Sequence, residues 1–491
     1  MLQTKTVERK EINNHPYLFV NLFFGFFPIS FILGTLIVNV HLLLFCCLGI
    51  YYLKSKVVTT KFDFSIKIIF LFFLIVFFST SLSLAKDLYF EGFEDLNLIR
   101  FTKSILFFRF FLFLIIIYLL SKFNILHFKY FFLISAFASV LVAFDIIFQY
   151  IFGFNIIGLT NPYYAHFNDP SLGELNIKRP DIRNSSFFGD EFIAGGYILK
   201  FAFFAIFFTV LIFKNKNYTK FISTVIVICI LGAGIFFSGN RMPLISFIFG
   251  LLLIFILDLK LKKILFVSLV VLLILFQFIF SSNEAYENAY SSFYGRAKNV
   301  MLAPFNITGT SKWEKVVEIK NSEGKTVGQK TISFEVPFES TQKRLFLTAI
   351  DTWKLNKIFG NGIKSFRVDC HKIGNELSRA EELYPGMENR LCSTHPHNYY
   401  FEILTETGAV GLIIVSIIAL FFIVFLFKNH KLIKQVNVSN FILLSAIISL
   451  ILETFPLKSS GSIFTTNNTT YLILIASIVL SYKKILKIKI E

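Results

Sequence analysis

The chain has 491 residues, of which 55% are apolar, and its mean hydropathy is +0.67. So much apolar surface excludes a soluble globular protein, because a soluble fold could not bury it. In a soluble chain the net charge of +17 would suggest a nucleic-acid partner. Here the lysines fall in short connections between apolar runs, so nucleic acid is not an expected partner, and the composition predicts a multi-pass protein surrounded by membrane lipids.

Apolar runs of the length of a transmembrane helix recur along the chain. They predict an all-α polytopic membrane protein of about twelve spans. Spans 1–9 form a membrane domain at 1–281, a polar external domain follows at 282–397, and spans 10–12 form the membrane part at 398–491. The predicted spans lie near 17–33, 36–53, 64–85, 98–120, 128–152, 192–213, 218–238, 242–257, 264–281, 398–427, 438–455 and 468–482.

Charge predicts the orientation of these spans. Lysines and arginines cluster in the N-terminal tail and after every second span, whereas the intervening connection 86–97 is acidic. The positive-inside rule therefore places both termini in the cytoplasm, as an even number of spans requires. The polar segments 153–191, 238–241 and 282–397 then face outward, which in a bacterium is the periplasmic side of the inner membrane.

The external segment 282–397 is too long to be a passive connection. Alternating apolar and polar residues on either side of a turn predict a β-hairpin at 312–336, and helical spacing predicts an amphipathic helix at 341–356. Cys370 and Cys392 are the two cysteines of this segment. We expect them to form a disulfide on the oxidising side of the membrane, the alternative being two free thiols.

A histidine cluster stands where the external segment returns to the membrane. His397 and Asn398 open a predicted helix that continues through Glu402 to Gly408, a C-cap or close-packing site. Histidine is the side chain most easily made a base near neutral pH, although an interfacial histidine capped by Asn398 and Glu402 would give the same pattern. His395 would not share a helix face with His397, and no cysteine or aspartate cluster completes a ligand set, so no metal site is expected.

Three arginines are predicted on the same side of the membrane. Arg241 ends the turn Ser-Gly-Asn-Arg, Arg183 precedes span 6, and Arg344 lies on the amphipathic helix. Arg241, at the edge of the bilayer, could simply extend into lipid headgroups. Together with the histidines they form a basic face suited to phosphate, which arginine binds through two parallel hydrogen bonds. A polyprenyl diphosphate would present its headgroup to this face.

These motifs resemble those of the O-antigen ligase and polymerase membrane family. His397-Asn398, nine residues, and then Gly408-Ala-Val-Gly411 match the signature of the ligases. The span end at 144–158, the Ser-Gly-Asn-Arg turn and the segment Phe-Gly-Asn-Gly-Ile-Lys-Ser-Phe before the histidines are similar to family elements in the same order. The resemblance covers about residues 140–455, and the hairpin at 312–336 departs from it as an insertion.

The resemblance implies a GT-C-like glycosyltransferase that needs neither metal nor cofactor. Its donor would be a glycan on undecaprenyl diphosphate, and its acceptor a sugar of lipid A–core, in lipopolysaccharide biosynthesis. By the resemblance, His397 would be the general base, with His395 as a spare base. Arg241 and Arg344 would hold the diphosphate, and Arg183 is a third candidate.

Other functions remain open at this point. A polymerase of the same family, acting on O-antigen or exopolysaccharide, would use a second lipid-linked glycan as acceptor and need the same residues. A secondary transporter would need ionisable residues within spans, for which Asp145 and Glu453 are the nearest candidates. A membrane scaffold without activity would not explain the basic outward cluster.

Overall fold

A computed structural model describes residues 17–54, 60–90, 95–160, 182–257, 261–302, 309–320, 326–338, 341–372, 391–433 and 436–488. In this part of the chain every predicted span coincides with an apolar helix or, for the first span, with a pair of helices. These are α2 (Leu18–Gly25) with α3 (Phe27–Leu33), α4 (Thr35–Leu53), α6 (Phe64–Phe90), α7 (Asp95–Lys122), α8 (Lys129–Phe152), α10 (Ala194–Ile212), α11 (Asn217–Phe237), α12 (Arg241–Ile256), α13 (Lys262–Ser282), α18 (Tyr399–Ile433), α19 (Val438–Glu453) and α20 (Thr466–Ile488).

Eight of the described helices are apolar and long enough to cross a membrane, namely α4, α6, α7, α8, α10, α11, α13 and α18. Helices α12 and α19 are shorter, at 16 residues each, and α20 has polar residues at both ends. The first predicted span is divided at Phe26, two residues before Pro28, whose missing N–H cannot extend a helix ladder. The chain is therefore a polytopic membrane protein, and the number twelve stays a prediction.

Helix α10 lies at the centre of the bundle, where it packs against α8, α11 and α19. Its phenylalanines fill the space between these neighbours; Phe204 meets the ring of Phe131 edge-on at 5.5 Å. Small residues allow the closest helix approach, because a Cβ on Gly234 of α11 would lie 2.7 Å from the Cα of Ala143 on α8. Aromatic packing and close backbone contact thus hold the bundle together without a hydrophobic effect inside the lipid.

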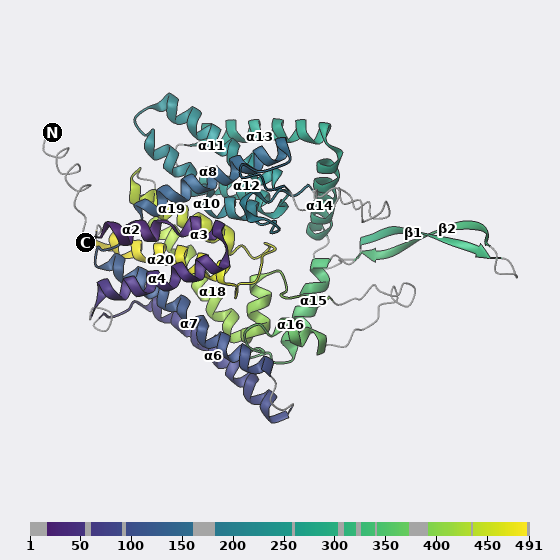
Figure 1. Cartoon of the computed structure of the whole chain (residues 1–491), viewed down its shortest axis with the longest axis horizontal. Coiled ribbons are helices and arrows are strands. Elements are labelled where there is room, and N and C mark those ends of the chain that lie inside the picture. Colours follow the sequence, from purple (N-terminus) through teal and green to yellow (C-terminus); the bar gives the residue numbers. More distant parts are fainter. Residues whose placement is uncertain are drawn as a thin grey trace.

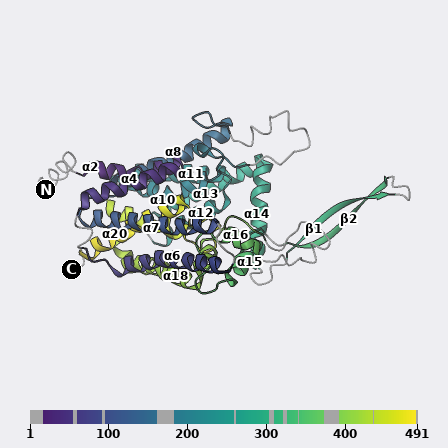
Figure 2. The same ribbon diagram turned by 60° about the horizontal axis from the view of Figure 1, so that its bottom comes forward.

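Between α13 and α18 the chain forms α14 (Glu284–Leu302), β1 (Gly309–Lys320), β2 (Thr326–Phe338), α15 (Thr341–Lys354), α16 (Phe366–Asp369) and the 3-10 turn η3 (Cys370–Lys372). These elements lie at one end of the helical bundle, and the hairpin extends away from it (Figures 1 and 2). Strands β1 and β2 pair antiparallel, with Trp313 opposite Phe334, as the alternating sequence predicts. The predicted amphipathic helix is α15. A second 3-10 turn, η2 (Ser186–Phe188), precedes α10.

Candidate active site

A large cavity of about 1760 Å³ opens at this end of the bundle. It exceeds the roughly 300–1,000 Å³ that accommodates a drug-sized ligand, so it suits an extended substrate. Among the described residues that line it, cations far outnumber carboxylates. The cations are Lys103, Arg109, Arg183, Lys200, Arg241, Lys364 and Lys458, and the carboxylates are Glu191 and Glu453. The cavity is therefore built for an anionic ligand.

Two of the three predicted arginines, Arg183 and Arg241, line this cavity. They come together because Gly239 in the Ser-Gly-Asn-Arg turn adopts a left-handed φ of +67° and leaves no side chain in the way. A Cβ at Gly239 would lie 2.8 Å from the Cγ of Arg183. The guanidinium of Arg183 stacks over the ring of Phe192, 4.5 Å from its centre.

Polar side chains fix the turn that carries Arg241. Asn240 accepts a hydrogen bond from the Gly195 N–H (3.1 Å) and donates one to the carbonyl of Phe192 (3.1 Å). Asn184 donates to the carbonyl of Phe237 (2.7 Å). The segment before α10 and the turn before α12 therefore form one rigid wall that presents Arg183 and Arg241 to the cavity.

Arg344 is placed by its helix. Helix α15 packs on α18, with the rings of Phe346 and Phe401 stacked at 4.6 Å, and Phe346 and Leu347 line the cavity. Arg344 therefore belongs to a wall-forming helix; its side chain lies outside the part of the structure that is described.

His397 lies at the entrance to α18, beside the cavity. Its carbonyl accepts a hydrogen bond from the N–H of Ser460 (2.9 Å), and both Ser460 and the adjacent Asn398 line the cavity, although the lining does not include His397 itself. Burial lowers the pKa of the His397 imidazole from the usual 6.5, and a hydrogen bond to the Ser460 backbone partly opposes this shift. His397 is therefore neutral near pH 7, the form that a general base requires.

The two histidines are neighbours in space, contrary to the helix-based expectation. Their ring centres are 4.2 Å apart. The expectation was wrong because both residues precede the helix and His397 has a left-handed φ of +54°, which turns its side chain back. The hydroxyl of Thr394 bonds to Nδ1 of His395 (3.0 Å), and burial lowers the pKa of His395 to about 4. His395 is thus a weak base.

Asn398 and Glu402 tie the start of α18 to the loop between α19 and α20. Asn398 caps the helix by accepting from the N–H of Tyr400 (3.0 Å), and it also donates to the carbonyl of Pro456 (2.7 Å). Glu402 is fully buried, where it accepts from the hydroxyl of Ser462 (2.5 Å) and the N–H of Ile463 (2.7 Å). These contacts make Asn398 and Glu402 positioning residues that hold the loop against His397.

Gly408 interrupts α18 rather than ending it. Its dihedrals (φ 67°, ψ −169°) are open only to glycine, and the helix continues beyond it to Ile433. The break lets the segment 357–362 bond to α18 on both sides through four backbone hydrogen bonds, from Asn361 to Thr405, Gly362 to Glu406, Ala409 to Lys357 and Val410 to Ile358. The segment 357–362, with its two glycines, is therefore bonded to the Gly-x-x-Gly part of the histidine motif; we call this contact the interlock. Gly411 packs one helical turn further on, where a Cβ would meet the side chain of Thr407.

Replacing Gly408 with alanine is expected to destabilise the protein by roughly 3 kcal/mol or more, because the new Cβ would be strained and would strike backbone. It would lie 2.6 Å from the Gly360 nitrogen and closer still to the Ile358 carbonyl. Thermal unfolding in detergent measures the effect. Gly196→Ala is the matched control, since a Cβ there meets no atom within 4 Å; equal midpoints for the two variants would contradict the interlock.

The structure joins Cys370 and Cys392 in a disulfide, with their Cα atoms 5.6 Å apart. Cys370 packs with Ala349 of α15 and Phe366 of α16 in a small apolar cluster that also contacts Phe401 of α18. The disulfide therefore fastens the segment that leads into the histidines to the helices beside the cavity.

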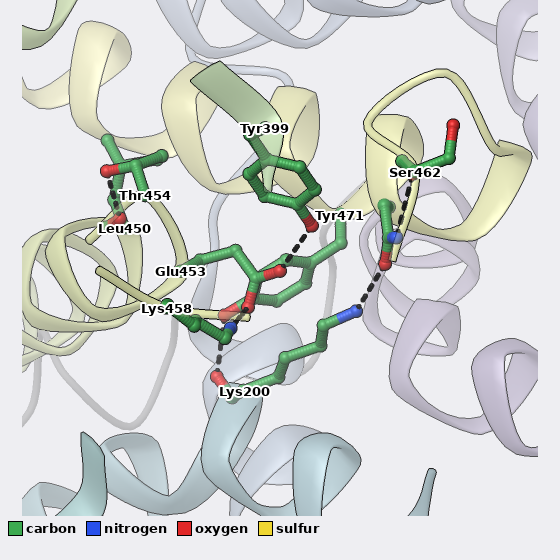
Figure 3. Close-up of polar contacts among 9 residues, drawn as sticks. Lys200, Tyr399, Leu450, Glu453, Thr454, Lys458, Ser462 and Tyr471 are labelled. Carbon is green, nitrogen blue, oxygen red and sulfur yellow. Dashed lines mark hydrogen bonds and ion pairs between the residues drawn. The ribbon is translucent and has the colours of Figure 1, made fainter. Parts of the chain in front are cut away.

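Several cavity residues were not predicted from the sequence. They are Lys103, Arg109, Lys200, Lys364 and Lys458. Figure 3 shows part of this group: Glu453 accepts hydrogen bonds from the hydroxyl of Tyr399 (2.7 Å) and the ammonium of Lys458 (2.7 Å). Charges inside otherwise apolar helices, such as Lys200, were the available signal.

The fold and the site together define a multi-pass membrane protein with a cationic cavity beside a neutral histidine. Residues 225–416 match the family model described as O-antigen ligase, which confirms the predicted family resemblance. The match runs from α11 through Arg241 and the elements between α13 and α18 to the histidine motif at the start of α18. None of the curated proteins compared with the chain matches it. The family supports a ligase or polymerase type of function in O-antigen biosynthesis, acting on lipid-linked glycans.

Proposed function

We propose that the protein is a ligase that transfers a glycan from undecaprenyl diphosphate to a sugar of lipid A–core, at the periplasmic face of the bacterial inner membrane, in lipopolysaccharide biosynthesis. The observation that carries this proposal is the cationic cavity bordered by Asn398 and Ser460, the two residues that flank and hold His397. A diphosphate needs cations, which line the cavity, and an acceptor hydroxyl needs a base, for which His397 lies beside the cavity.

In the proposed reaction the neutral imidazole of His397 takes the proton of an acceptor hydroxyl as its oxygen attacks the anomeric carbon of the donor glycan. The bond from that carbon to the diphosphate oxygen breaks, and undecaprenyl diphosphate leaves with the electron pair. Arg183, Arg241 and Arg344 hold the diphosphate and stabilise the charge that develops on it. The cations of the protein serve this role in the proposal, which therefore includes neither metal nor cofactor.

The proposed orientation rests on the lysine pattern of the connections, which places both termini in the cytoplasm. The disulfide near His397 supports an oxidising compartment for the same face. The cavity and the external elements 282–397 would then be periplasmic, where lipid-linked glycans are joined to lipid A–core.

The two carboxylates that a transporter could use for an ion have other partners in the structure. Asp145 of α8 accepts hydrogen bonds from the hydroxyl of Ser186 (2.5 Å) and the N–H of Ile156 (2.8 Å), so it fixes the segments that follow α8. Glu453 is bonded to Lys458 and Tyr399. Both carboxylates have structural partners that an ion pathway would have to displace.

Deleting the gene tests the proposed function. Loss of a ligase is expected to leave lipid A–core without polymer on a lipopolysaccharide gel, while undecaprenyl-linked polymer accumulates. Loss of a polymerase would instead leave core bearing a single repeat unit. An unchanged glycan profile, together with full complementation by His397→Ala, would contradict the whole assignment.

A further inference from the structure

A second group of cations lies on the cavity wall around the first turn of α20. Arg109 of α7 reaches Thr466 with its guanidinium (3.4 Å), and the ammonium of Lys200 on α10 donates to Asn468 (3.1 Å). Figure 3 shows Lys200 extended toward the polar cluster that includes Ser462. Two cations from separate helices therefore converge on the start of a third, and all three elements line the cavity.

Both cations lie inside apolar helices. Arg109 is roughly 16 Å along α7 from Leu98, and Lys200 is roughly 9 Å along α10 from Ala194. A charge at such a position is costly unless it faces a polar cavity or a partner of opposite charge. These two positions are therefore functional candidates.

The protein groups bonded to these cations are neutral. Arg109 contacts the hydroxyl of Thr466 and, at 3.5 Å, the amide of Asn39, while its Nε is buried without a partner among the described residues. Lys200 bonds to an amide oxygen; the carboxylate of Glu453 lies near it but is bonded by Lys458 at 2.7 Å. The first N–H groups of α20 add positive potential, because a helix leaves them without intrahelical acceptors. This wall therefore favours an anion.

The donor diphosphate does not account for this wall. It bears one negative charge on each phosphate, whereas seven described cations face only two carboxylates in the cavity. Asn240, next to Arg241, contacts α10 at Gly195, and Lys200 lies roughly 8 Å further along that helix. The two charges of the donor diphosphate are matched by Arg183 and Arg241 on the first wall, which leaves Arg109 and Lys200 for a second anion.

We propose that Arg109, Lys200 and the first turn of α20 bind a phosphate group carried by the acceptor glycolipid. This inference rests on the proposed function, because it assigns one wall of the cavity to the donor and the other to the acceptor. The acceptor would then be selected by its phosphate, and its sugar would be held at a fixed distance from His397.

Binding of lipid A–core to the purified protein in nanodiscs tests the proposal without requiring transfer. The probe is lipid A–core, intact and after removal of its phosphates, bound to the wild type, to Arg109→Gln and to Lys200→Met. Removal of the phosphates is expected to weaken binding to the wild type by roughly 10- to 100-fold, the value of a charged hydrogen bond. Each variant should bind intact acceptor weakly and distinguish the two acceptors little, and Arg109→Lys should restore part of the difference.

Lys214→Met is the matched control, since it removes one positive charge at an exposed position after α10. Equal binding of both acceptors by the wild type would overturn the proposal. Variants that lose binding by the same factor for both acceptors would also overturn the proposal. The two cations would then bind a phospholipid or support the fold, and they would not bind the acceptor phosphate. Where transfer is observed, a higher donor KM in the variants would assign this wall to the donor instead. If no transfer is observed but the wild type still distinguishes the two acceptors, only the proposed function is contradicted.

Discussion

Replacing His397 with alanine is expected to reduce the rate of glycan transfer by about 10²- to 10⁴-fold, the usual contribution of a general base. The backbone of His397 is held by Ser460 and the adjacent Asn398 caps α18, so loss of the imidazole should leave the fold intact. The rate of glycosylated lipid A–core formation by purified protein measures the effect. His395→Ala should reduce it less than tenfold, because a pKa of about 4 makes His395 a weak base. Equal losses in the two variants would contradict the assignment.

The pH profile provides a second test of the same residue. Burial lowers the pKa of His397, so its neutral form persists below the ordinary value of 6.5 and is lost only when the pH falls through the lowered pKa. The acid limb of the transfer rate should therefore lie below pH 6.5, and it should disappear from the residual activity of His397→Ala. An acid limb above pH 6.5 would show that another group controls the reaction.

Replacing Arg241 with glutamine is expected to reduce transfer by roughly 10²- to 10³-fold, because a cation that stabilises the leaving diphosphate is lost. Arg241→Lys should recover only part of the rate, since an ammonium cannot form the paired hydrogen bonds of a guanidinium. Steady-state kinetics with varied donor measure both the rate and the donor KM. Lys214→Met, outside the cavity, should retain the wild-type rate. Full activity of Arg241→Gln would show that the donor diphosphate does not bind at this wall.

The local features of this protein could be predicted from its sequence. The length of the apolar runs predicted the helices, and the alternation of apolar and polar residues predicted the hairpin. The polar residues at the start of α18 predicted a helix capped by Asn398. The interlock at Gly408 could not be predicted, because a left-handed glycine within a helix and a C-cap have the same sequence pattern. The structure was needed to show that the glycine makes room for backbone at Ile358.

The composition of the cavity could not be predicted for a different reason. Lys103, Arg109, Lys200 and Lys458 come from three parts of the chain, namely α7, α10 and the loop between α19 and α20, and helical spacing indicates the face of a helix but not its neighbour. In the sequence Arg109 is a single charge within an apolar run, and only the packing of α20 in the structure shows that Thr466 lies beside it. Tertiary packing gathers these charges.

The most direct test of the account is the product formed by purified wild-type protein in nanodiscs from glycan-bearing undecaprenyl diphosphate and lipid A–core. Mass spectrometry is expected to find the glycan on lipid A–core and one free undecaprenyl diphosphate for each glycan transferred. A glycan lengthened on undecaprenyl diphosphate, with lipid A–core unchanged, would contradict the ligase assignment, and the absence of any transferred glycan would contradict the enzyme itself.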